Sequence, residues 1–164
     1  MSKTQENLKE AFAGESQANR KYLAFADQAD KEGFKAVAKL FRAAAAAETI
    51  HAHKHLKVMQ GINATSDNLK EAIAGETHEF KSMYPKMIAE AQAEGNRGAE
   101  ISFTYANEVE KVHAALYQEA LDNLKDYPEH DFYVCRICGH TVADEVPDQC
   151  PVCGSKKNGF CKVE

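Results

Sequence analysis

The chain has 164 residues, which fits one ordinary domain or one domain with a small appendage. Its formal net charge of −5 gives no electrostatic case for binding nucleic acid, and it has no run of 18 apolar residues to suggest a membrane span. The polar start MSKTQENLKE lacks the apolar segment of a secretion signal, so we expect a cytoplasmic protein.

Most of the chain has the composition of long helices. Residues 3–126 are rich in Ala, Glu, Lys, Gln and Leu, and Pro85 is the only proline among them. Turn-forming residues interrupt this pattern and leave four predicted helices, near 3–31, 34–60, 67–94 and 98–126. Ser66 or Asp67 is the expected N-cap of the third helix. Four long helices joined by short turns predict an all-α four-helix bundle.

The helical part contains an internal repeat. NLKEAFAGES at 7–16 returns as NLKEAIAGET at 68–77, which is a shift of 61 residues. Farther along, the match continues at a shift of 62, where Glu48 aligns with Glu110 and His51 with His113. The repeated unit is therefore a helical hairpin of about sixty residues, and two copies imply an approximate twofold axis.

Acidic residues interrupt the apolar stripe of each predicted helix. A single Glu on such a stripe is usually a boundary residue whose carboxylate reaches water, and a single Glu-x-x-His is also a weak signal. Glu from two helices combined with Glu-x-x-His from two others is, however, the ligand pattern of ferritin-like di-iron bundles. The duplicated positions therefore predict a two-metal site whose ligands are Glu15, Glu48, His51, Glu76, Glu110 and His113.

The second copy adds a fifth carboxylate, because Glu79 stands where the first copy has Ala18. Five carboxylates around two ferrous ions carry a net charge of −1. The same five around two ferric ions and one oxide bridge also carry −1. Since buried charge is expensive, we hypothesise that Glu79 suits the site to a two-electron reaction, and that Glu79→Gln lowers turnover.

All five cysteines lie in the last thirty residues. Four of them form two CxxCG motifs, CRICG at 135–139 and CPVCG at 150–154. The two motifs are strong signals for a four-cysteine metal site, although their spacing does not decide between zinc and iron. We predict that 128–164 forms a separate module of turns and short strands, held together by the metal. Cys161 lies outside the pattern and receives no role.

The chain as a whole resembles the rubrerythrin family, which joins a ferritin-like di-iron bundle to a rubredoxin-like module with one iron bound by four cysteines. The resemblance rests on AGES at 13–16, ETIH at 48–51, AGETHEF at 74–80, EKVH at 110–113 and the two CxxCG sequences. It implies a di-iron bundle over 1–127 and a module over 128–164, and it implies that the module's iron is bound by Cys135, Cys138, Cys150 and Cys153.

The resemblance also implies roles at the di-iron site. Glu48 and Glu110 would bridge the irons, and Glu15 would bind one iron terminally. Glu76 and His113 would bind the other iron. At the first iron, Glu79 would be bound in the oxidised state and His51 in the reduced state. Two tyrosines would line the site, Tyr22 and Tyr84.

The activity implied is reduction of hydrogen peroxide to water, as protection against oxidative stress. The cofactors would be an Fe2+/Fe3+ pair, oxo-bridged when oxidised, and one iron in the four-cysteine site. Electrons would come from an NAD(P)H-dependent reductase or a rubredoxin, because the chain has no GxGxxG sequence, and would pass through the four-cysteine iron to the di-iron site. In the family the module of one chain serves the bundle of another, which implies a head-to-tail homodimer or a larger homo-oligomer.

Two other functions are compatible with the same residues. One is a ferroxidase that handles iron for storage, which would not need the cysteine module. The other is a non-catalytic metal-binding protein with zinc in the tail.

Overall fold

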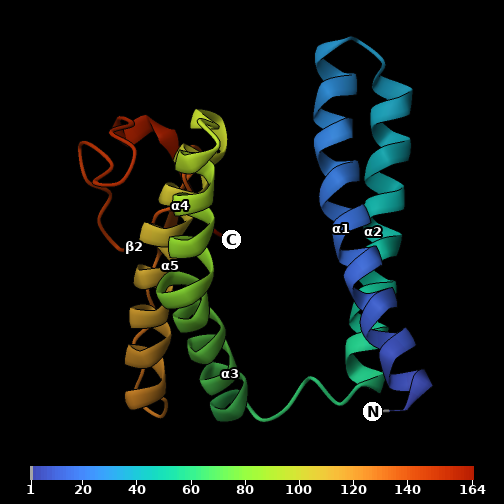
Figure 1. The fold of residues 1–164 in the computed structure, drawn as a ribbon, viewed down its shortest axis with the longest axis horizontal. Helices are drawn as coiled ribbons and strands as arrows, with labels where there is room; N and C mark the ends of the chain where they lie inside the picture. Colours follow the sequence, from blue (N-terminus) through green and yellow to red (C-terminus); the bar gives the residue numbers. More distant parts are fainter. Residues whose placement is uncertain (1) are drawn as a thin grey trace. The chain divides into compact units, whose positions relative to one another are not determined.

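The structure is a computed structural model that describes residues 2–164. It divides the chain into a first compact unit that ends at Asn63 and a second unit, Ala64–Glu164. The first unit is one helical hairpin, and the second combines another hairpin with a small antiparallel sheet (Figure 1). The predicted domain boundary at 127/128 lies inside the second unit and stays a prediction. No helix within residues 2–164 is long and apolar enough to cross a membrane.

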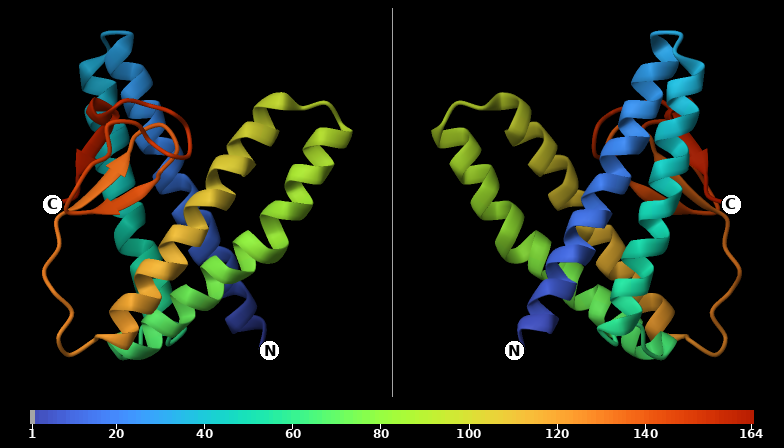
Figure 2. Two further views of the ribbon diagram at one scale, coloured as in Figure 1. Left: turned by 90° about the vertical axis from the view of Figure 1, so that its left-hand side faces the viewer. Right: turned by 90° about the vertical axis from the view of Figure 1, so that its right-hand side faces the viewer.

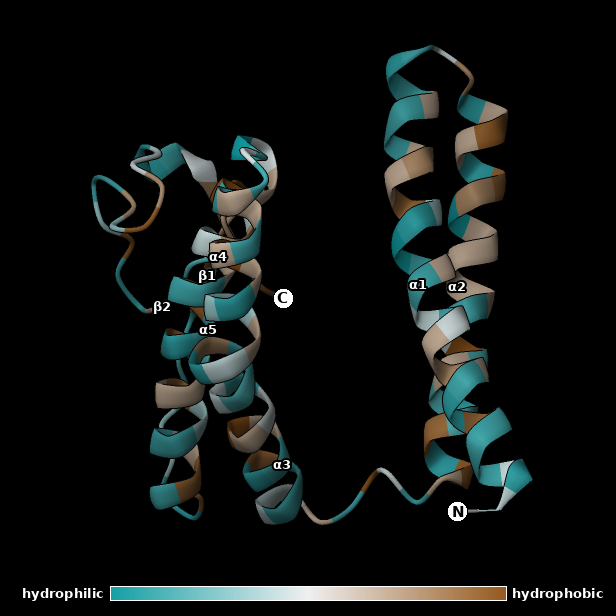
Figure 3. Cartoon of the chain, viewed as in Figure 1, coloured by the Kyte–Doolittle hydropathy of each residue, from teal (hydrophilic) through white to brown (hydrophobic). Residues whose placement is uncertain are grey.

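The first hairpin pairs α1 (Lys3–Lys31) with α2 (Lys35–Val58). Its buried apolar residues are all alanines: Ala26, Ala29, Ala38, Ala45 and Ala52. Because alanine has the smallest apolar side chain, the two helices can approach closely along this line. Larger apolar side chains such as Phe25 and Leu40 are exposed, and Figure 3 shows apolar and polar residues interspersed along both helices.

Both hairpins turn in the same way. In the first, Gly33 has a φ of +86°, and the N–H of Phe34 donates to the carbonyl of Ala29 at 2.8 Å. In the second, Gly95 has a φ of +68°, and the N–H of Asn96 donates to the carbonyl of Ala91 at 2.9 Å. A left-handed glycine with this hydrogen bond ends a helix without leaving its last carbonyls unpaired. The shift of 62 residues is therefore visible as repeated backbone geometry.

The second hairpin contains α3 (Thr65–His78), a π-helical turn η1 (Glu79–Met83), α4 (Tyr84–Ala93) and α5 (Arg97–Asp122). The predicted third helix is thus three consecutive helical segments. The predicted N-cap at Ser66 or Asp67 is wrong, because α3 begins at Thr65, and Ala64 occupies the cap position without a side-chain hydrogen bond. Asp67 lies in the first turn, where its charge favours the positive end of the helix dipole.

The π-helical turn accounts for the change in repeat spacing. Glu76 matches Glu15 at a shift of 61, whereas Tyr84 matches Tyr22 at a shift of 62. The second copy therefore has one extra residue between positions 76 and 84, and η1 occupies that interval. A single wide turn within an α-helix is the usual way to absorb an extra residue, and such turns are frequent at functional sites.

The C-terminal module is a three-stranded sheet in the order β2-β1-β3, with both pairs antiparallel. Its strands are β1 (Phe132–Cys135), β2 (Thr141–Ala143) and β3 (Phe160–Lys162), which appear as short arrows in Figure 2. A 3-10 turn, η2 (Lys157–Gly159), precedes β3. The short strands confirm the predicted turn-and-strand character. Strand β2 contacts α5, so this module is packed on the second hairpin.

Candidate metal centres

The first hairpin brings one acidic and histidine cluster together, which we call the first triad: Glu15 on α1 with Glu48 and His51 on α2. The ligand atoms of these three side chains all lie within 4.8 Å of one another. The Nδ1 of His51 is 2.9 Å from a carboxylate oxygen of Glu48 and 3.8 Å from one of Glu15. The side chain of His51 is 53% exposed, whereas that of Glu48 is 18% exposed. The triad is therefore open to solvent on its histidine side.

A buried amide fixes α1 against α2 one turn from Glu15. The Nδ2 of Asn19 donates to the carbonyl of Ala45 at 2.7 Å and to the hydroxyl of Thr49 at 2.8 Å. Asn19 is only 6% exposed, so neither hydrogen bond competes strongly with water. Because Thr49 directly follows Glu48, this contact sets the register of the two helices where the first triad forms.

The second hairpin assembles the equivalent second triad from Glu76 on α3 with Glu110 and His113 on α5. The Nδ1 of His113 is 2.8 Å from a carboxylate oxygen of Glu110 and 3.8 Å from one of Glu76. The side chain of His113 is 29% exposed. The second triad thus repeats the ligand types and contacts of the first but shields its histidine better.

The second triad holds more negative charge than its surroundings neutralise. Burial, followed by a hydrogen bond and charge repulsion from Glu110, raises the pKa of Glu76 to about 7. Burial also raises the pKa of Glu110. Carboxylates that resist ionisation in this way need a proton or a cation between them. Because the triad offers two carboxylates and one imidazole, its donor set fits a divalent metal such as iron.

Glu79 and Tyr84 lie beside the second triad. Burial raises the pKa of Tyr84, and the negative charges of Glu79, Glu110 and Glu76 raise it further. Glu79 is partly buried at the start of η1 and also acts on the carboxyl of Glu110. It is not among the three groups that converge within 4.8 Å, so its place is next to the triad rather than in it.

Four cysteines converge in the C-terminal module: Cys135, Cys138, Cys150 and Cys153. The sulfur of Cys135 is 3.6 Å from that of Cys153, and the sulfur of Cys138 is 3.6 Å from that of Cys150. A disulfide would need about 2.05 Å, whereas tetrahedral ligands at ~2.3 Å from a metal are about 3.8 Å apart. The spacing therefore fits one tetrahedral metal ion.

Backbone geometry prepares the four sulfurs for a metal. Gly139 and Gly154 follow the two CxxC pairs with φ values of +83° and +74°, which glycine adopts most easily. Burial raises the pKa of Cys135, but hydrogen bonds from the Ser155 hydroxyl and from the Ile137 and Cys138 N–H groups outweigh it and lower that pKa to about 6. Thiolate is the form that binds metal.

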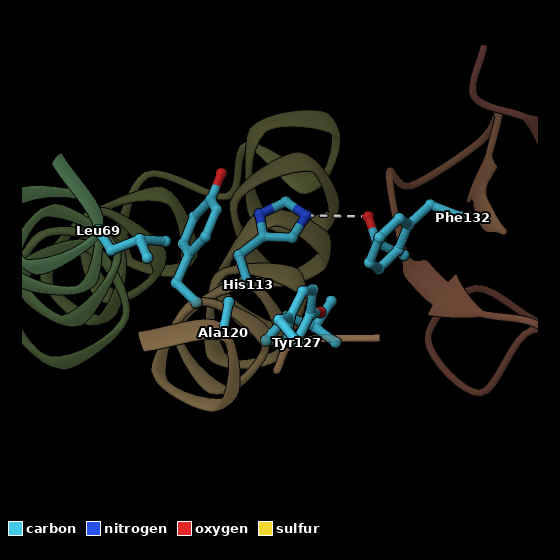
Figure 4. Close-up of a pocket in the computed structure, with 8 residues that line it drawn as sticks. Leu69, His113, Ala120, Tyr127 and Phe132 are labelled. Atoms are coloured by element: carbon cyan, nitrogen blue, oxygen red, sulfur yellow. Dashed lines mark hydrogen bonds between the residues drawn. The ribbon is translucent and has the colours of Figure 1, made fainter. Parts of the chain in front are cut away.

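The cysteine module touches the second triad directly. The hydroxyl of Thr141, the first residue of β2, is 3.0 Å from the Nε2 of His113, as the dashed line in Figure 4 marks. Beside this contact lies a cavity of about 360 Å³, lined mainly by apolar side chains that include Leu69, Ala120 and Phe132. A predominantly apolar lining limits water next to His113.

The structure brings most of the predicted site residues into three clusters. Six predicted carboxylate and histidine ligands form the two triads, and the four predicted cysteines form the third cluster. Tyr22 lies against Phe41 in the first hairpin, with ring centroids 6.2 Å apart. Cys161, for which no role is predicted, lies on β3 with its thiol directed to the carbonyl of Val134.

Sequence reasoning missed three polar residues at these clusters. Asn19 and Thr141 carry no motif, and only their positions on the folded chain show their contacts. Ser155 is different, because it directly follows the second CxxCG and its hydroxyl lies 3.1 Å from Cys135 and 3.3 Å from Cys153. A hydroxyl residue at that place could have been proposed as a thiolate partner.

Two family models match the chain. The model described as Rubrerythrin matches residues 6–121, and the model described as Rubrerythrin, rubredoxin-like domain matches residues 133–160. Together they cover both helical hairpins and the cysteine module.

Curated relatives match over nearly the whole length. Rubrerythrin-2 of Clostridium acetobutylicum is 37% identical, covering 96% of this chain and 95% of that protein. Nigerythrin of Nitratidesulfovibrio vulgaris is 38% identical, covering 96% of this chain and 85% of that protein. Rubrerythrin of Porphyromonas gingivalis is 33% identical, covering 97% of this chain and 89% of that protein.

Solved structures of nigerythrin are similar to this chain. Its mixed-valence state and its fully reduced, all-ferrous state each match with a TM-score of 0.60 and 35% identity, covering 99% of this chain and 88% of that one. These matches confirm the predicted fold class, a ferritin-like duplicated helical hairpin with a C-terminal rubredoxin-like module. They also confirm the cofactor prediction, because the chain carries ligand sets for both a di-iron site and an iron bound by four cysteines. On the family models, the relatives and its own metal-ligand clusters, the chain belongs to the rubrerythrin family.

Proposed function

We propose that the protein is a non-haem di-iron peroxidase that reduces hydrogen peroxide to water and protects the cell against oxidative stress. The observation that carries the proposal is the hydrogen bond between Thr141 and His113, because it joins an electron-carrying type of site to a carboxylate and histidine triad. A ferroxidase would need the triads but not the attached cysteine module. The family assignment supports the same class of reaction.

The reaction consumes two electrons and two protons for each peroxide and releases two water molecules. When bound, the irons supply the electrons. Glu15, Glu48 and His51 would hold iron in the first hairpin, and Glu76, Glu110 and His113 would hold iron in the second. Their duplicated geometry supports this, since each triad presents two carboxylates and one imidazole nitrogen.

The side chains around the second triad are suited to managing protons. Glu76, with its pKa raised to about 7, holds a proton near neutral pH and releases it when a cation neutralises the cluster. The raised pKa of Tyr84 keeps its hydroxyl protonated, so it can donate to a neighbouring oxygen. Glu79 lies near Tyr84, which supports its role as the fifth carboxylate that balances charge as the irons change oxidation state. Glu79 would serve as an iron ligand in the oxidised state and His51 in the reduced state, and the exposure of His51 leaves its ring room to move.

Electrons would enter at the four-cysteine site from an NAD(P)H-dependent reductase or a rubredoxin and continue to the di-iron centre. The contact between the module and the second triad lies within one chain, which supports a short internal route. The head-to-tail homodimer implied by the family resemblance stays a prediction. We place the protein in the cytoplasm, because a reducing compartment keeps four converging cysteines available as metal ligands.

The test uses the colour of the iron-loaded four-cysteine site. Dithionite should bleach it, and hydrogen peroxide should restore it in the wild-type protein. Glu110→Ala should abolish the restoration, whereas Glu108→Ala, an exposed carboxylate on the same helix, should leave it intact. Restoration at the wild-type rate in Glu110→Ala would show that the triads are not the catalyst. If the purified protein is colourless and contains only zinc, the proposed peroxidase activity is contradicted.

Steady-state assays then separate the peroxidase from a ferroxidase. With an artificial reductase chain, a peroxidase consumes NAD(P)H in proportion to peroxide, and Glu79→Gln lowers that rate. A ferroxidase instead oxidises added Fe2+ without needing the four cysteines, so a Cys138→Ser variant would keep its full activity.

A further inference from the structure

The hydroxyl of Thr141 has a fixed direction in its hydrogen bonds. It donates to the carbonyl of Gly139 at 3.1 Å, because a carbonyl can only accept. A hydroxyl has one hydrogen, so towards His113 the same oxygen must act as the acceptor. The Nε2 of His113, 3.0 Å away, therefore carries the hydrogen.

This assignment decides which nitrogen of His113 is free. In a neutral imidazole, a hydrogen on Nε2 leaves a lone pair on Nδ1. Nδ1 is the atom that faces the triad, 2.8 Å from Glu110 and 3.8 Å from Glu76. Thr141 therefore selects the tautomer that presents a ligand nitrogen to the two carboxylates.

The two triads differ in this respect. His51 also faces its carboxylates through Nδ1, but its side chain is 53% exposed, against 29% for His113. A residue of the cysteine module contacts His113 at Nε2, and a Cβ placed on Gly139, two residues before Thr141, would lie 3.9 Å from the Val109 side chain on α5. The ring of His113 is thus held at Nε2, while Nδ1 presents its lone pair to the two carboxylates.

We propose that Thr141 is a positioning residue for the second triad: it locks the tautomer and orientation of His113, so that packing of the cysteine module on α5 raises the metal affinity of that triad. The proposal depends on the proposed function in one respect, which is that the second triad binds metal. Groups that accept the second N–H of a ligand histidine typically change metal affinity by about 10–100-fold.

The experiment compares Thr141→Val, which keeps shape but loses the hydroxyl, with Thr141→Ser, which keeps the hydroxyl. Thr104→Val on an exposed position of α5 is the matched control. Zinc is the probe, because it is diamagnetic and first fills the four-cysteine site, so that later equivalents report on the triads. Competition with a chelator gives the affinity, and ¹H–¹⁵N spectra give the tautomer and the exchange rate of the His113 ring N–H.

In wild-type protein, Thr141→Ser and Thr104→Val, we expect a His113 ring protonated on Nε2, with slow exchange. Thr141→Val should bind zinc at the second triad about 10–100-fold more weakly and exchange its ring N–H at least about ten-fold faster. A Thr141→Ala variant with the same losses supports the same conclusion if the valine disturbs folding. Thr141→Val with wild-type affinity and exchange overturns this inference alone. Wild-type protein that binds zinc only at the cysteines overturns the proposed function, and this inference with it.

Discussion

Tyr84 packs against Phe103 with ring centroids 6.3 Å apart and planes inclined by 36°. The equivalent pair in the first hairpin, Tyr22 and Phe41, has values of 6.2 Å and 35°. The duplicated chain thus reproduces an aromatic contact as well as its ligand positions. Burial and three carboxylates raise the pKa of Tyr84. Tyr22 and Tyr84 therefore share a packing role, and comparing them isolates the chemical role of the Tyr84 hydroxyl.

Replacing Tyr84 with Phe should keep the ring contact and remove the proton donor beside Glu79. We expect peroxide turnover to fall by about ten-fold or more, since a positioned proton donor commonly contributes about 10²–10⁴-fold. The free energy of unfolding should change by less than about 1 kcal/mol. Tyr22→Phe makes the same chemical change in the first hairpin. If both variants lose turnover equally, or neither does, Tyr84 has no special role.

The stability of the metal-free protein should fall as pH rises towards 8. The pKa of Glu76 is about 7 in the folded chain and 4.5 as an isolated group, so the folded state binds this proton more tightly. The contribution of Glu76 to the free energy of unfolding is complete below about pH 4.5 and is lost as pH rises through about 7. We expect a loss on the order of 2 kcal/mol between about pH 5 and 8, measured by urea unfolding after chelation. Glu76→Gln should flatten the profile, and exposed Glu71→Gln should not.

Removal of one buried thiol should destroy the four-cysteine site without blocking the triads. Cys150 is 2% exposed and contributes to the tetrahedral sulfur arrangement, so Cys150→Ser should lose the module's iron and its colour. Reductase-driven peroxide consumption should stop, while protein reduced chemically at the triads should still react with peroxide. Cys161→Ser serves as the control, because its thiol points to the Val134 carbonyl, and it should retain colour and activity.

The amide of Asn19 should contribute measurably to the first hairpin. Asn19→Ala removes one buried and one partly buried hydrogen bond between α1 and α2, and we expect a loss of about 1–3 kcal/mol in unfolding free energy. Gln28→Ala removes an exposed hydrogen bond from the same helix and should cost less than about 0.5 kcal/mol. Equal urea midpoints for the two variants would contradict a role for Asn19 in holding the helices together.

The carboxylate and histidine clusters could be predicted because these polar side chains occupy positions on otherwise apolar helix faces. A Glu or His on an apolar helix face is conspicuous in sequence, and duplication supplied a second instance of each, so that Glu48 and Glu110 supported one another. The four-cysteine site could also be predicted, because the two cysteines of each CxxC pair are close in sequence and must therefore be close in space. The hairpin turns at Gly33 and Gly95 lie where turn-forming residues separate the predicted helices.

Contacts between distant segments were not predictable in this way. Thr141 and His113 are 28 residues apart, and neither the strand nor the helix carries a pattern that points to the other. Asn19 looks like any polar residue on a helix until α2 is placed beside it. The start of α3 was misplaced because Ser66 and Asp67 are good caps by composition, yet the backbone becomes helical at Thr65. The roles assigned to Glu79 and His51 stay predictions.

The wide turn at Glu79–Met83 has a consequence for how a duplicated gene can diverge. A codon inserted into a regular α-helix rotates every later side chain by about 100°, which would uncouple Tyr84 from Phe103. Here the extra residue is absorbed within η1, and the contact of Tyr84 with Phe103 keeps the geometry of Tyr22 with Phe41. One copy of a duplicated hairpin can therefore gain a carboxylate at position 79 without losing the aromatic contact that follows the wide turn.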